Sequence, residues 1–301
     1  MPGKEPVQRR DPLAGATRPE ALTQSELNFI GTRSGLKVLP LVGAGSLLLA
    51  HLLTAAAFRR RTDAMIARLE QASVTDQATP PLPAIIQSLA RRAVRETAVP
   101  NTVWLRQCGE MRANLRGSWR PFSAEQVISI HEPAFAWIAR MQAAPLASAH
   151  VLDCYMDGKG LLEGRLFGSL QVARAAGAPA AKGELMRYLA ELVWAPYAML
   201  HNPKLSWREI DASTFEVSAE SPAGSARVRL IFENGDIARI EADDRPRMVG
   251  HRIVPTRWQG RCCDYREMNG CRIPTRAVLS WLLEDGPFEY WRGRVTAFRM
   301  K

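Results

Sequence analysis

The sequence predicts an α+β protein: an N-terminal transmembrane helix, then a curved antiparallel β-sheet, half-barrel-like, covered by one or two helices. The run VLPLVGAGSLLLAHLLTAAAF, residues 38–58, contains no formally charged side chain, and about 20 apolar residues cross a bilayer as a helix. From about residue 102 the pattern changes to short alternating segments separated by turn signals, which is typical of paired strands. We therefore expect a membrane-anchored chain whose bulk is one β-rich domain.

The segment before the apolar run is polar and basic. Residues 1–36 lack hydrophobic periodicity and contain several prolines and arginines, so we expect a disordered basic tail. The chain has a formal charge of +10, and half of this excess lies in residues 1–61. This distribution favours a membrane flank over a nucleic-acid surface.

The predicted transmembrane helix covers residues 37–58. Three consecutive arginines follow it, which disfavours a cleaved signal peptide. The positive-inside rule leans towards a cytoplasmic C-terminal side, because these arginines directly follow the span. A signal-anchor arrangement, with the large domain outside, is the alternative. We therefore predict a single-pass membrane protein and leave the side of its large domain open.

A helix extension and a proline-rich linker are expected over residues 59–82, before a single β-rich domain at 83–301. At the start of that domain, apolar side chains recur at helical spacing, which predicts an amphipathic helix. The recurring residues are Ile85, Ile86, Leu89, Ala93 and Thr97. This helix either packs on the domain, which we favour, or lies on the membrane surface.

Turn signals predict how the strands connect. Asn-Gly pairs at 234–235 and 269–270 suit two-residue hairpin turns, in which both central residues need positive φ. Closely spaced hairpins imply an antiparallel meander, since parallel strands need longer crossovers. The main interruption is residues 182–195, which we expect to form a helix in the concavity of the sheet, stopped by Pro196.

Cysteines and basic residues do not predict a cofactor. The five cysteines include no C-x-x-C pair, so we expect no metal site, and no Walker or dinucleotide motif occurs. Buried free thiols are favoured, and one disulfide from Cys271 is the alternative. Nucleic acid is not an expected partner, because Asp243, Asp244 and Asp264 interrupt the arginines around them.

Six motifs occur in the order found in a bacterial family of unknown function. They are MRANLRGSWRPFSAEQ (111–126), FAWIARM (135–141), DCYMDGKG (153–160), GELMRYLAELVWAPYAML (183–200), NGCRIPT (269–275) and PFEYWRGRVTAF (287–298). The chain resembles that family over about residues 83–300. The resemblance implies one domain and assigns no activity, substrate or cofactor, so it transfers no residue role.

A second, fold-level resemblance rests on the strand CRIPT (271–275) after a hairpin. In this feature the chain is similar to periplasmic lipoprotein carriers of the LolA/LppX type. That likeness implies a half-open β-barrel whose helices cover an apolar cavity, and it does not establish function.

Glu191 is the candidate catalytic residue. A helix over 182–195 places Glu184, Arg187 and Glu191 on one face. That face either points into the cavity mouth, where Glu191 would have a perturbed pKa, or forms a solvated ion pair. The eight tryptophans likewise either fill the core or line a cavity. The ligand-binding candidates are Arg187, Glu191, Trp194, Tyr188, Trp137 and Tyr155.

Three functions fit this pattern. The first is a membrane-anchored domain that holds a lipid or another apolar molecule in the half-barrel, with the bilayer and that molecule as partners. The second is a hydrolase or isomerase that uses Glu191 as acid or base with Arg187 orienting substrate. The third is an envelope scaffold without a ligand. The sequence predicts no oligomeric state.

Overall fold

The structure, a computed structural model, describes residues 35–71, 81–94, 99–144, 147–250 and 252–301; the side chains of 35–44 and 143 lie outside this description. Nearly all of the predicted tail and most of the predicted proline-rich linker therefore also lie outside it. The chain divides into two compact units, 1–48 and 49–301. The predicted domain boundaries remain predictions.

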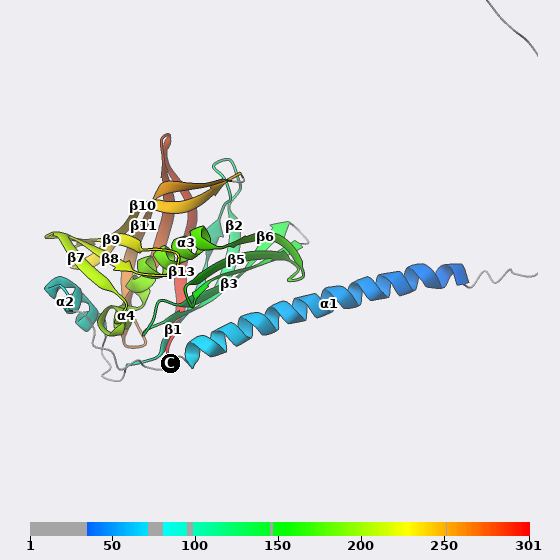
Figure 1. The fold of residues 1–301 in the computed structure, drawn as a ribbon, viewed down its shortest axis with the longest axis horizontal. Coiled ribbons are helices and arrows are strands. Elements are labelled where there is room, and N and C mark those ends of the chain that lie inside the picture. The colour runs from blue at the N-terminus through cyan, green and yellow to red at the C-terminus, as the bar shows by residue number, and fades with distance from the viewer. Residues whose placement is uncertain (1–34, 72–80, 95–98, 145–146, 251) are drawn as a thin grey trace, which may run out of the picture. The chain divides into compact units, whose positions relative to one another are not determined.

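The second unit contains one antiparallel sheet, with thirteen strands in the part of the chain that is described (Figure 1). The strands are β1 (Thr102–Met111), β2 (Arg120–Ser129), β3 (Phe135–Ala144), β4 (Ala147–Met156), β5 (Lys159–Leu166), β6 (Leu170–Ala176), β7 (Ser206–Asp211), β8 (Thr214–Ala219), β9 (Ala226–Glu233), β10 (Asp236–Val249), β11 (Arg252–Met268), β12 (Cys271–Leu283) and β13 (Gly286–Met300). The helices are α1 (Gly35–Glu70), α2 (Ala84–Ala93), α3 (Ala178–Ala190), the 3-10 turn η1 (Glu191–Trp194) and α4 (Pro196–His201).

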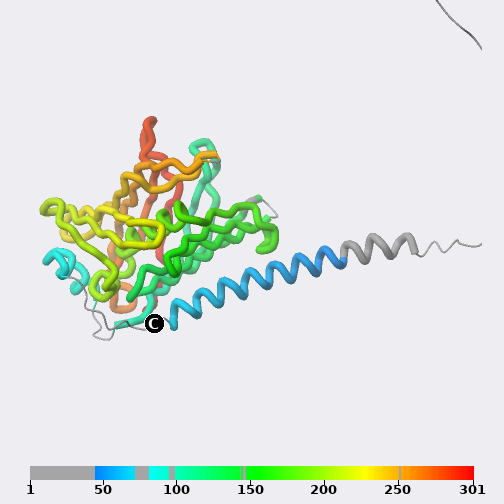
Figure 2. The backbone as a smooth tube through the Cα atoms, viewed as in Figure 1, coloured from blue at the N-terminus to red at the C-terminus, as the bar shows by residue number. Residues whose placement is uncertain are grey.

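Two meanders join in the middle of the sheet. The strand order is β6-β5-β4-β3-β2-β1-β13-β12-β11-β10-β9-β8-β7, so the first and last strands of the chain pair with each other. Val103 faces Met300 in this central pair. Helix α3 contacts strands of both meanders, and the open sheet curves around it (Figure 2). The predicted curved antiparallel sheet is confirmed.

The predicted hairpin turns have the expected backbone. Asn234 and Gly235 have φ values of 54° and 81°, and Asn269 and Gly270 have 45° and 75°. Positive φ at both central positions matches the right-handed twist of the flanking strands. These turns connect β9 to β10 and β11 to β12, so the local signal fixes two adjacent strand pairings.

The sheet is covered by helices on both faces. On the inner face, Val103 and Leu105 pack with α3, η1, α4 and α2 in the larger core cluster. Trp104, between them, points to the outer face, because successive strand side chains alternate. There it packs with Phe58 and Leu69 of α1. The predicted extension after residue 58 is therefore a helix that packs on the outer face.

An ion-pair cluster also holds α1 to this face. Arg61 lies 2.6 Å from the buried carboxylate of Glu163 on β5, which also pairs with Arg165 at 2.5 Å and Arg174 at 3.2 Å. Burial alone would raise the pKa of Glu163, but hydrogen bonds from Arg165 and Arg61 outweigh it and lower the pKa. The carboxylate is thus kept charged against α1.

The predicted transmembrane helix coincides with part of α1. Its first residues, 37–44, fall where side chains lie outside the description. Among the described residues, no helix combines the length and hydropathy that a membrane crossing needs.

The helix expected over 182–195 is divided in the structure. Its α-helical part ends at Ala190, η1 follows, and Pro196 begins α4, so the prediction that one helix runs up to Pro196 was wrong at its end. A proline ring clashes with the carbonyl four residues earlier and has no N–H to donate. The chain therefore leaves α-helical geometry before Pro196, at Glu191.

Helix α2 packs on the domain, as the favoured interpretation expects. Ile86, Leu89, Ala90 and Ala93 are buried, and the helix contacts α4 and β12.

Candidate functional site

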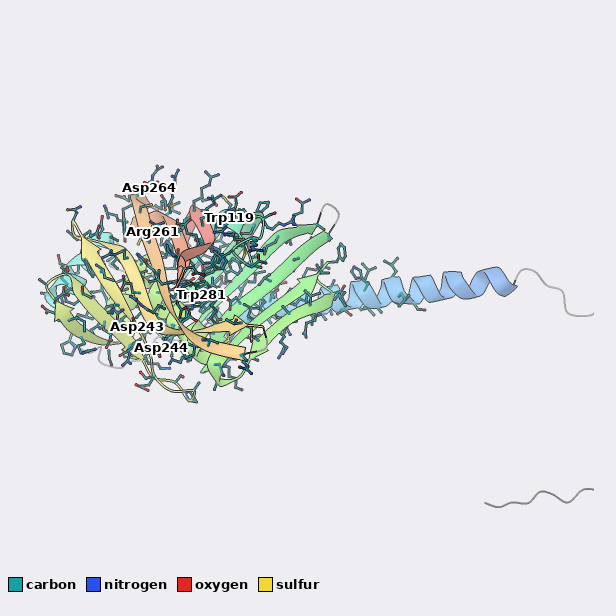
Figure 3. The ribbon with its side chains drawn as sticks, turned by 90° about the horizontal axis from the view of Figure 1, so that it is seen from above. Trp119, Asp243, Asp244, Arg261, Asp264 and Trp281 are labelled. Atoms are coloured by element: carbon teal, nitrogen blue, oxygen red, sulfur yellow. The ribbon has the colours of Figure 1, made fainter. Side chains whose placement is uncertain are left out.

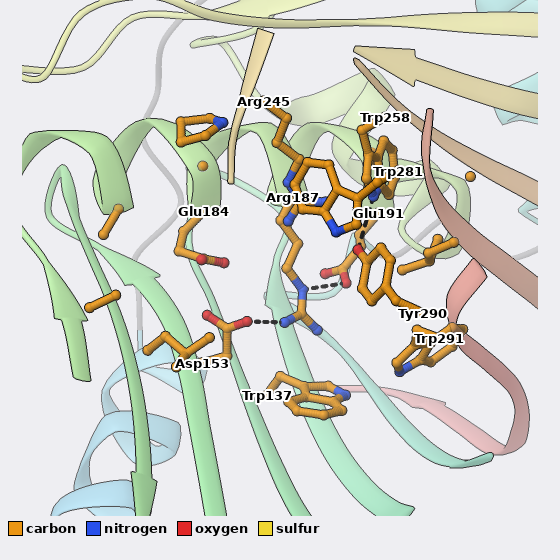
Figure 4. Close-up of a pocket in the computed structure, with 18 of the residues that line it drawn as sticks. Trp137, Asp153, Glu184, Arg187, Glu191, Arg245, Trp258, Trp281, Tyr290 and Trp291 are labelled. Atoms are coloured by element: carbon orange, nitrogen blue, oxygen red, sulfur yellow. Dashed lines mark hydrogen bonds and ion pairs between the residues drawn. The ribbon is translucent and has the colours of Figure 1, made fainter. Parts of the chain in front are cut away.

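A cavity of about 450 Å³ lies on the inner face of the sheet, bordered by α3 and η1 and by strands of both meanders. Its size falls within the range of small-molecule sites, about 300–1,000 Å³. Aromatic side chains form part of its largely apolar walls, and several of them are drawn in Figure 4. The tryptophans that line it are Trp137, Trp194, Trp258, Trp281 and Trp291.

Neighbouring groups fix several of these indoles. Trp194 Nε1 donates to the carbonyl oxygen of Pro274 at 2.9 Å, and Trp258 Nε1 donates to the hydroxyl oxygen of Tyr290, also at 2.9 Å. The Trp281 ring stacks on Tyr290 with centroids 5.7 Å apart. Since indole N–H groups usually need a partner when buried, these bonds let the ring surfaces serve as walls.

The position of the Trp291 ring requires a glycine at residue 293. A Cβ at Gly293 would lie 2.5 Å from the Trp291 ring, closer than any side chain can approach. Gly293 faces Gly109 across the central β1–β13 pair, and a Cβ at Gly109 would lie 2.1 Å from the backbone oxygen of Arg292. This paired-glycine position therefore allows the close backbone approach beside the cavity.

Arg187 of α3 forms the centre of a polar cavity floor. Its Nε donates to Glu191 Oε1 at 2.8 Å, and its Nη1 donates to Asp153 Oδ2 on β4. Its guanidinium lies 5.0 Å from the ring centroids of both Phe135 and Trp137. The cation is thus held between two carboxylates and two aromatic rings; Figure 4 shows it with Asp153, Glu191 and Trp137.

A chain of side-chain hydrogen bonds continues from Glu191 into the sheet. Gln126 Nε2 donates to Glu191 Oε2, and Gln107 Nε2 donates to Gln126 Oε1 at 3.1 Å. Trp137 Nε1 donates to Gln107 Oε1 at 2.8 Å. Strands β1–β3 thus hold the far end of the hydrogen-bond chain that orients Glu191.

Burial perturbs the charges on this floor. Burial first, and then the charge of Asp153, raises the pKa of Glu184 well above its ordinary value. Burial also raises the pKa of Glu191, although Arg187 opposes this. For Arg187, burial alone would lower the pKa, but Glu191 and Asp153 outweigh it and raise the pKa. The floor therefore keeps Arg187 charged and favours a protonated Glu184.

The structure brings four of the six ligand-binding candidates to the cavity. Arg187, Glu191, Trp194 and Trp137 line it. Tyr155 and Tyr188 lie in the core, 3% and 0% exposed, and neither belongs to the lining. The Tyr188 hydroxyl donates to Ser129 O at 3.1 Å and accepts from Asn202 Nδ2 at 2.8 Å, which is a structural arrangement.

Some lining residues could not be selected from the sequence. Gln107 reaches the floor through strand pairing across β1–β3, and no local motif marks a glutamine for such a role. Trp258, Trp281 and Trp291 carry only the general signal of aromatic residues in strands. Glu184, in contrast, follows from its helical spacing with Arg187.

Arginines on the second meander pair with carboxylates. Arg261 lies 2.6 Å from Glu289, and Asp264 lies 3.0 Å from Arg276. Asp243 pairs with Arg229 at 2.5 Å. Figure 3 labels Asp243, Arg261 and Asp264 along this part of the sheet. Their mixed charges match the interruption of basic residues noted in the sequence.

Comparisons with known proteins give a family and a set of distant structures. The model of a family of unknown function, DUF6544, matches residues 72–293. No curated protein matches the sequence. Among solved structures, a LolA superfamily protein from Nitrosomonas europaea is similar with 12% identity and a TM-score of 0.36, over 72% of this chain and 93% of that one.

Two further structures are similarly distant. A putative outer membrane lipoprotein-sorting protein domain from Vibrio parahaemolyticus has 9% identity and a TM-score of 0.41, over 72% of this chain and 91% of that one. A DUF1329 family protein from Desulfovibrio piger has 11% identity and a TM-score of 0.40, over 74% and 94%. At these TM-scores the likeness carries no information on ligand or activity, so we argue function from the site itself.

Proposed function

This chain belongs to the DUF6544 family, whose function is unknown, and we propose that it binds an apolar small molecule or lipid in the cavity of its curved sheet. The observation that carries this proposal is the cavity itself, about 450 Å³ with five tryptophans in its walls and a few polar groups at its floor. Apolar walls with a small number of convergent polar groups are the usual composition of a ligand site.

The walls support binding because they are held in place before a ligand enters. Trp258, Trp281 and Tyr290 form one bonded and stacked group. A preformed aromatic surface loses little side-chain freedom on binding, which leaves more of the burial free energy as affinity. The apolar contacts would then contribute about 25 cal/mol for each Å² of ligand and wall surface removed from water.

The test uses the neutral fluorescent probe N-phenyl-1-naphthylamine with the full chain. We expect saturable binding that Trp281→Ala weakens about 10-fold or more, as for an aromatic anchor residue. Trp119→Ala is the matched control, because Trp119 lies outside the cavity and stacks on Arg112 and Arg292; both tryptophans are labelled in Figure 3. Equal effects of the two variants, or no saturable binding, would contradict the proposal. Mass spectrometry of compounds that co-purify with the chain then identifies the natural ligand.

We further propose that the apolar segment around residues 37–58 holds the domain at a bilayer as a single-pass anchor, with its last residue, Phe58, packed on the sheet instead. In support, α1 exposes a run of leucines, 54–75% accessible, at positions 47, 48, 49, 52 and 53. Exposed apolar patches of this kind mark membrane or protein contacts. Fractionation of cells that express the full chain tests this: extraction by carbonate or high salt alone would rule the anchor out.

A second candidate function rests on Glu184 and Glu191. Both carboxyls line the cavity and both have a raised pKa, which is the environment of a general acid. An enzyme would release a chemically changed compound, whereas a binding protein would return its ligand intact. Mass spectrometry of the ligand after incubation distinguishes them, and turnover that persists in both Glu184→Gln and Glu191→Gln would exclude these acids.

A further inference from the structure

The carboxyl groups at the cavity floor outnumber the cation that pairs with them. Asp153, Glu184 and Glu191 all line the cavity. Within the described residues, Arg187 supplies the ion pairs of this group, one to Asp153 and one to Glu191. Buried charges are retained in proteins when they are paired or coordinated. Of these three carboxyl groups, Glu184 therefore has no ion-pair partner among the described residues.

Two oxygen atoms of this group receive no hydrogen bond from an N–H or hydroxyl group in the described structure, and a protonated Glu184 can share its proton with Asp153. The two oxygens are Asp153 Oδ1 and Glu184 Oε2, on residues that are only 7% and 8% exposed. Buried polar atoms almost always have a partner, and each exception calls for an explanation. Here both exceptions come from neighbouring cavity-lining carboxyl groups, on β4 and on α3.

We propose that the ligand carries a protonated amine on an apolar body, with the ammonium group between Asp153 and Glu184 and the body against the tryptophans. This inference rests on the proposed binding function and specifies the chemical class of its ligand. The ammonium supplies N–H donors to both unpartnered oxygens. A protonated Glu184 releases its proton to solvent as the ammonium enters, so one positive charge replaces another.

The surroundings favour a cation with N–H groups over other head groups. The faces of aromatic rings attract cations, and Trp137 adjoins the floor beside Arg187. A quaternary ammonium has no N–H to donate to the two oxygens. An anionic head would meet Asp153, and Arg187 is already bonded to Asp153 and Glu191.

Arg245 is the cavity-lining cation that could favour an anionic ligand over an ammonium. It lines the cavity from β10, with its guanidinium 4.8 Å from the Trp258 ring centroid. It also lowers the pKa of Glu184 in opposition to burial and to Asp153. An anionic ligand would have to bind there, so the test must include Arg245.

The experiment compares three probes of equal chain length, decylamine, decanol and decanoate, by calorimetry at pH 7 on the full chain. We expect decylamine to bind most tightly. We expect the affinity ratio of decylamine to decanol to fall about 10- to 100-fold in Asp153→Asn and Glu184→Gln, the usual effect of removing a charged hydrogen-bond partner. Glu125→Gln, which removes a 45% exposed carboxylate on β2, should keep the wild-type ratio.

The outcomes separate this inference from the function on which it rests. The amine site is wrong, and apolar binding stands, if decanol binds but decylamine binds no better. The same conclusion follows if decanoate binds best and Arg245→Met abolishes that preference. If none of the three probes binds, the proposed function itself fails. Vesicles of phosphatidylcholine with and without phosphatidylethanolamine identify the source of the amine. Selective extraction of the aminolipid indicates a membrane source, and decylamine binding without extraction indicates a soluble amine.

Discussion

Replacement of Arg187 by methionine should destabilise the domain far more than the loss of an exposed arginine. The Arg187 side chain is 16% exposed, and its two carboxylate partners are 9% and 10% exposed. Removing one partner of a buried ion pair costs about 3–5 kcal/mol, because it leaves uncompensated buried charge. For a domain of this size that corresponds to a fall in Tm of about 6–20 °C.

Thermal and urea unfolding of the full chain measure this effect. Arg106→Met is the matched control, since Arg106 and Glu125 are 63% and 45% exposed and such pairs contribute about 1 kcal/mol or less. The pH dependence provides a second check. Without Arg187, which opposes the rise, the folded-state pKa of Glu191 should lie further above its unfolded value. The folded state then binds protons more tightly, and the deficit should shrink from pH 8 to pH 5. A Tm loss no larger than that of the control, or one that does not change with pH, would refute the reasoning.

Three further predictions concern the floor, the central strand pair and the outer face. Glu184→Gln should stabilise the folded chain, and the gain in urea titrations should grow from pH 5 to pH 8. The reason is that the pKa of Glu184 is raised in the folded state, so this residue destabilises the fold once the carboxyl of the unfolded chain ionises. A difference that is negative or does not change with pH would contradict this. Gly109→Ala should lower the free energy of unfolding by about 1–3 kcal/mol or more, the range of overpacking costs, because its Cβ would lie 2.1 Å from a backbone oxygen. Gly183→Ala, whose nearest contact is 3.8 Å away on a helix, should instead be neutral or stabilise by up to about 1 kcal/mol. Phe58→Ala should speed labelling of buried Cys154 by a thiol reagent, because it removes packing between α1 and the outer face, whereas exposed Cys263 should react at its wild-type rate.

The sequence is sufficient for features that depend on neighbours in the chain. The Asn-Gly turns follow from φ preferences, and the grouping of Glu184, Arg187 and Glu191 follows from helical spacing. The orientation of that group does not, because it depends on how the sheet curves around α3. Only then does the group become a cavity floor rather than a solvated face.

Contacts between residues on strands that are distant in the chain could not be predicted from the sequence. Gln126 meets Glu191, and Gln107 meets Gln126 across the paired strands β1 and β2. Tyr155 and Tyr188 looked equivalent to Trp137 and Trp194 as aromatic candidates, but their positions place them in the core. The end of α3 was misplaced because the steric effect of Pro196 extends several residues back along the chain.

The central pairing of β1 with β13 has a consequence for synthesis of the chain. As a polypeptide leaves the ribosome, β1 emerges early, yet its partner β13 is nearly the last segment translated. Until then β1 is an open edge of the sheet β1–β6, in addition to the edge at β6, and such an edge readily pairs with other chains. Residues separated by nearly 200 positions must meet before the two halves become one sheet, and long-range pairing of this kind is slow. We therefore expect nascent or truncated chains to depend on chaperones, and pulse-labelled chains to gain protease resistance only after release.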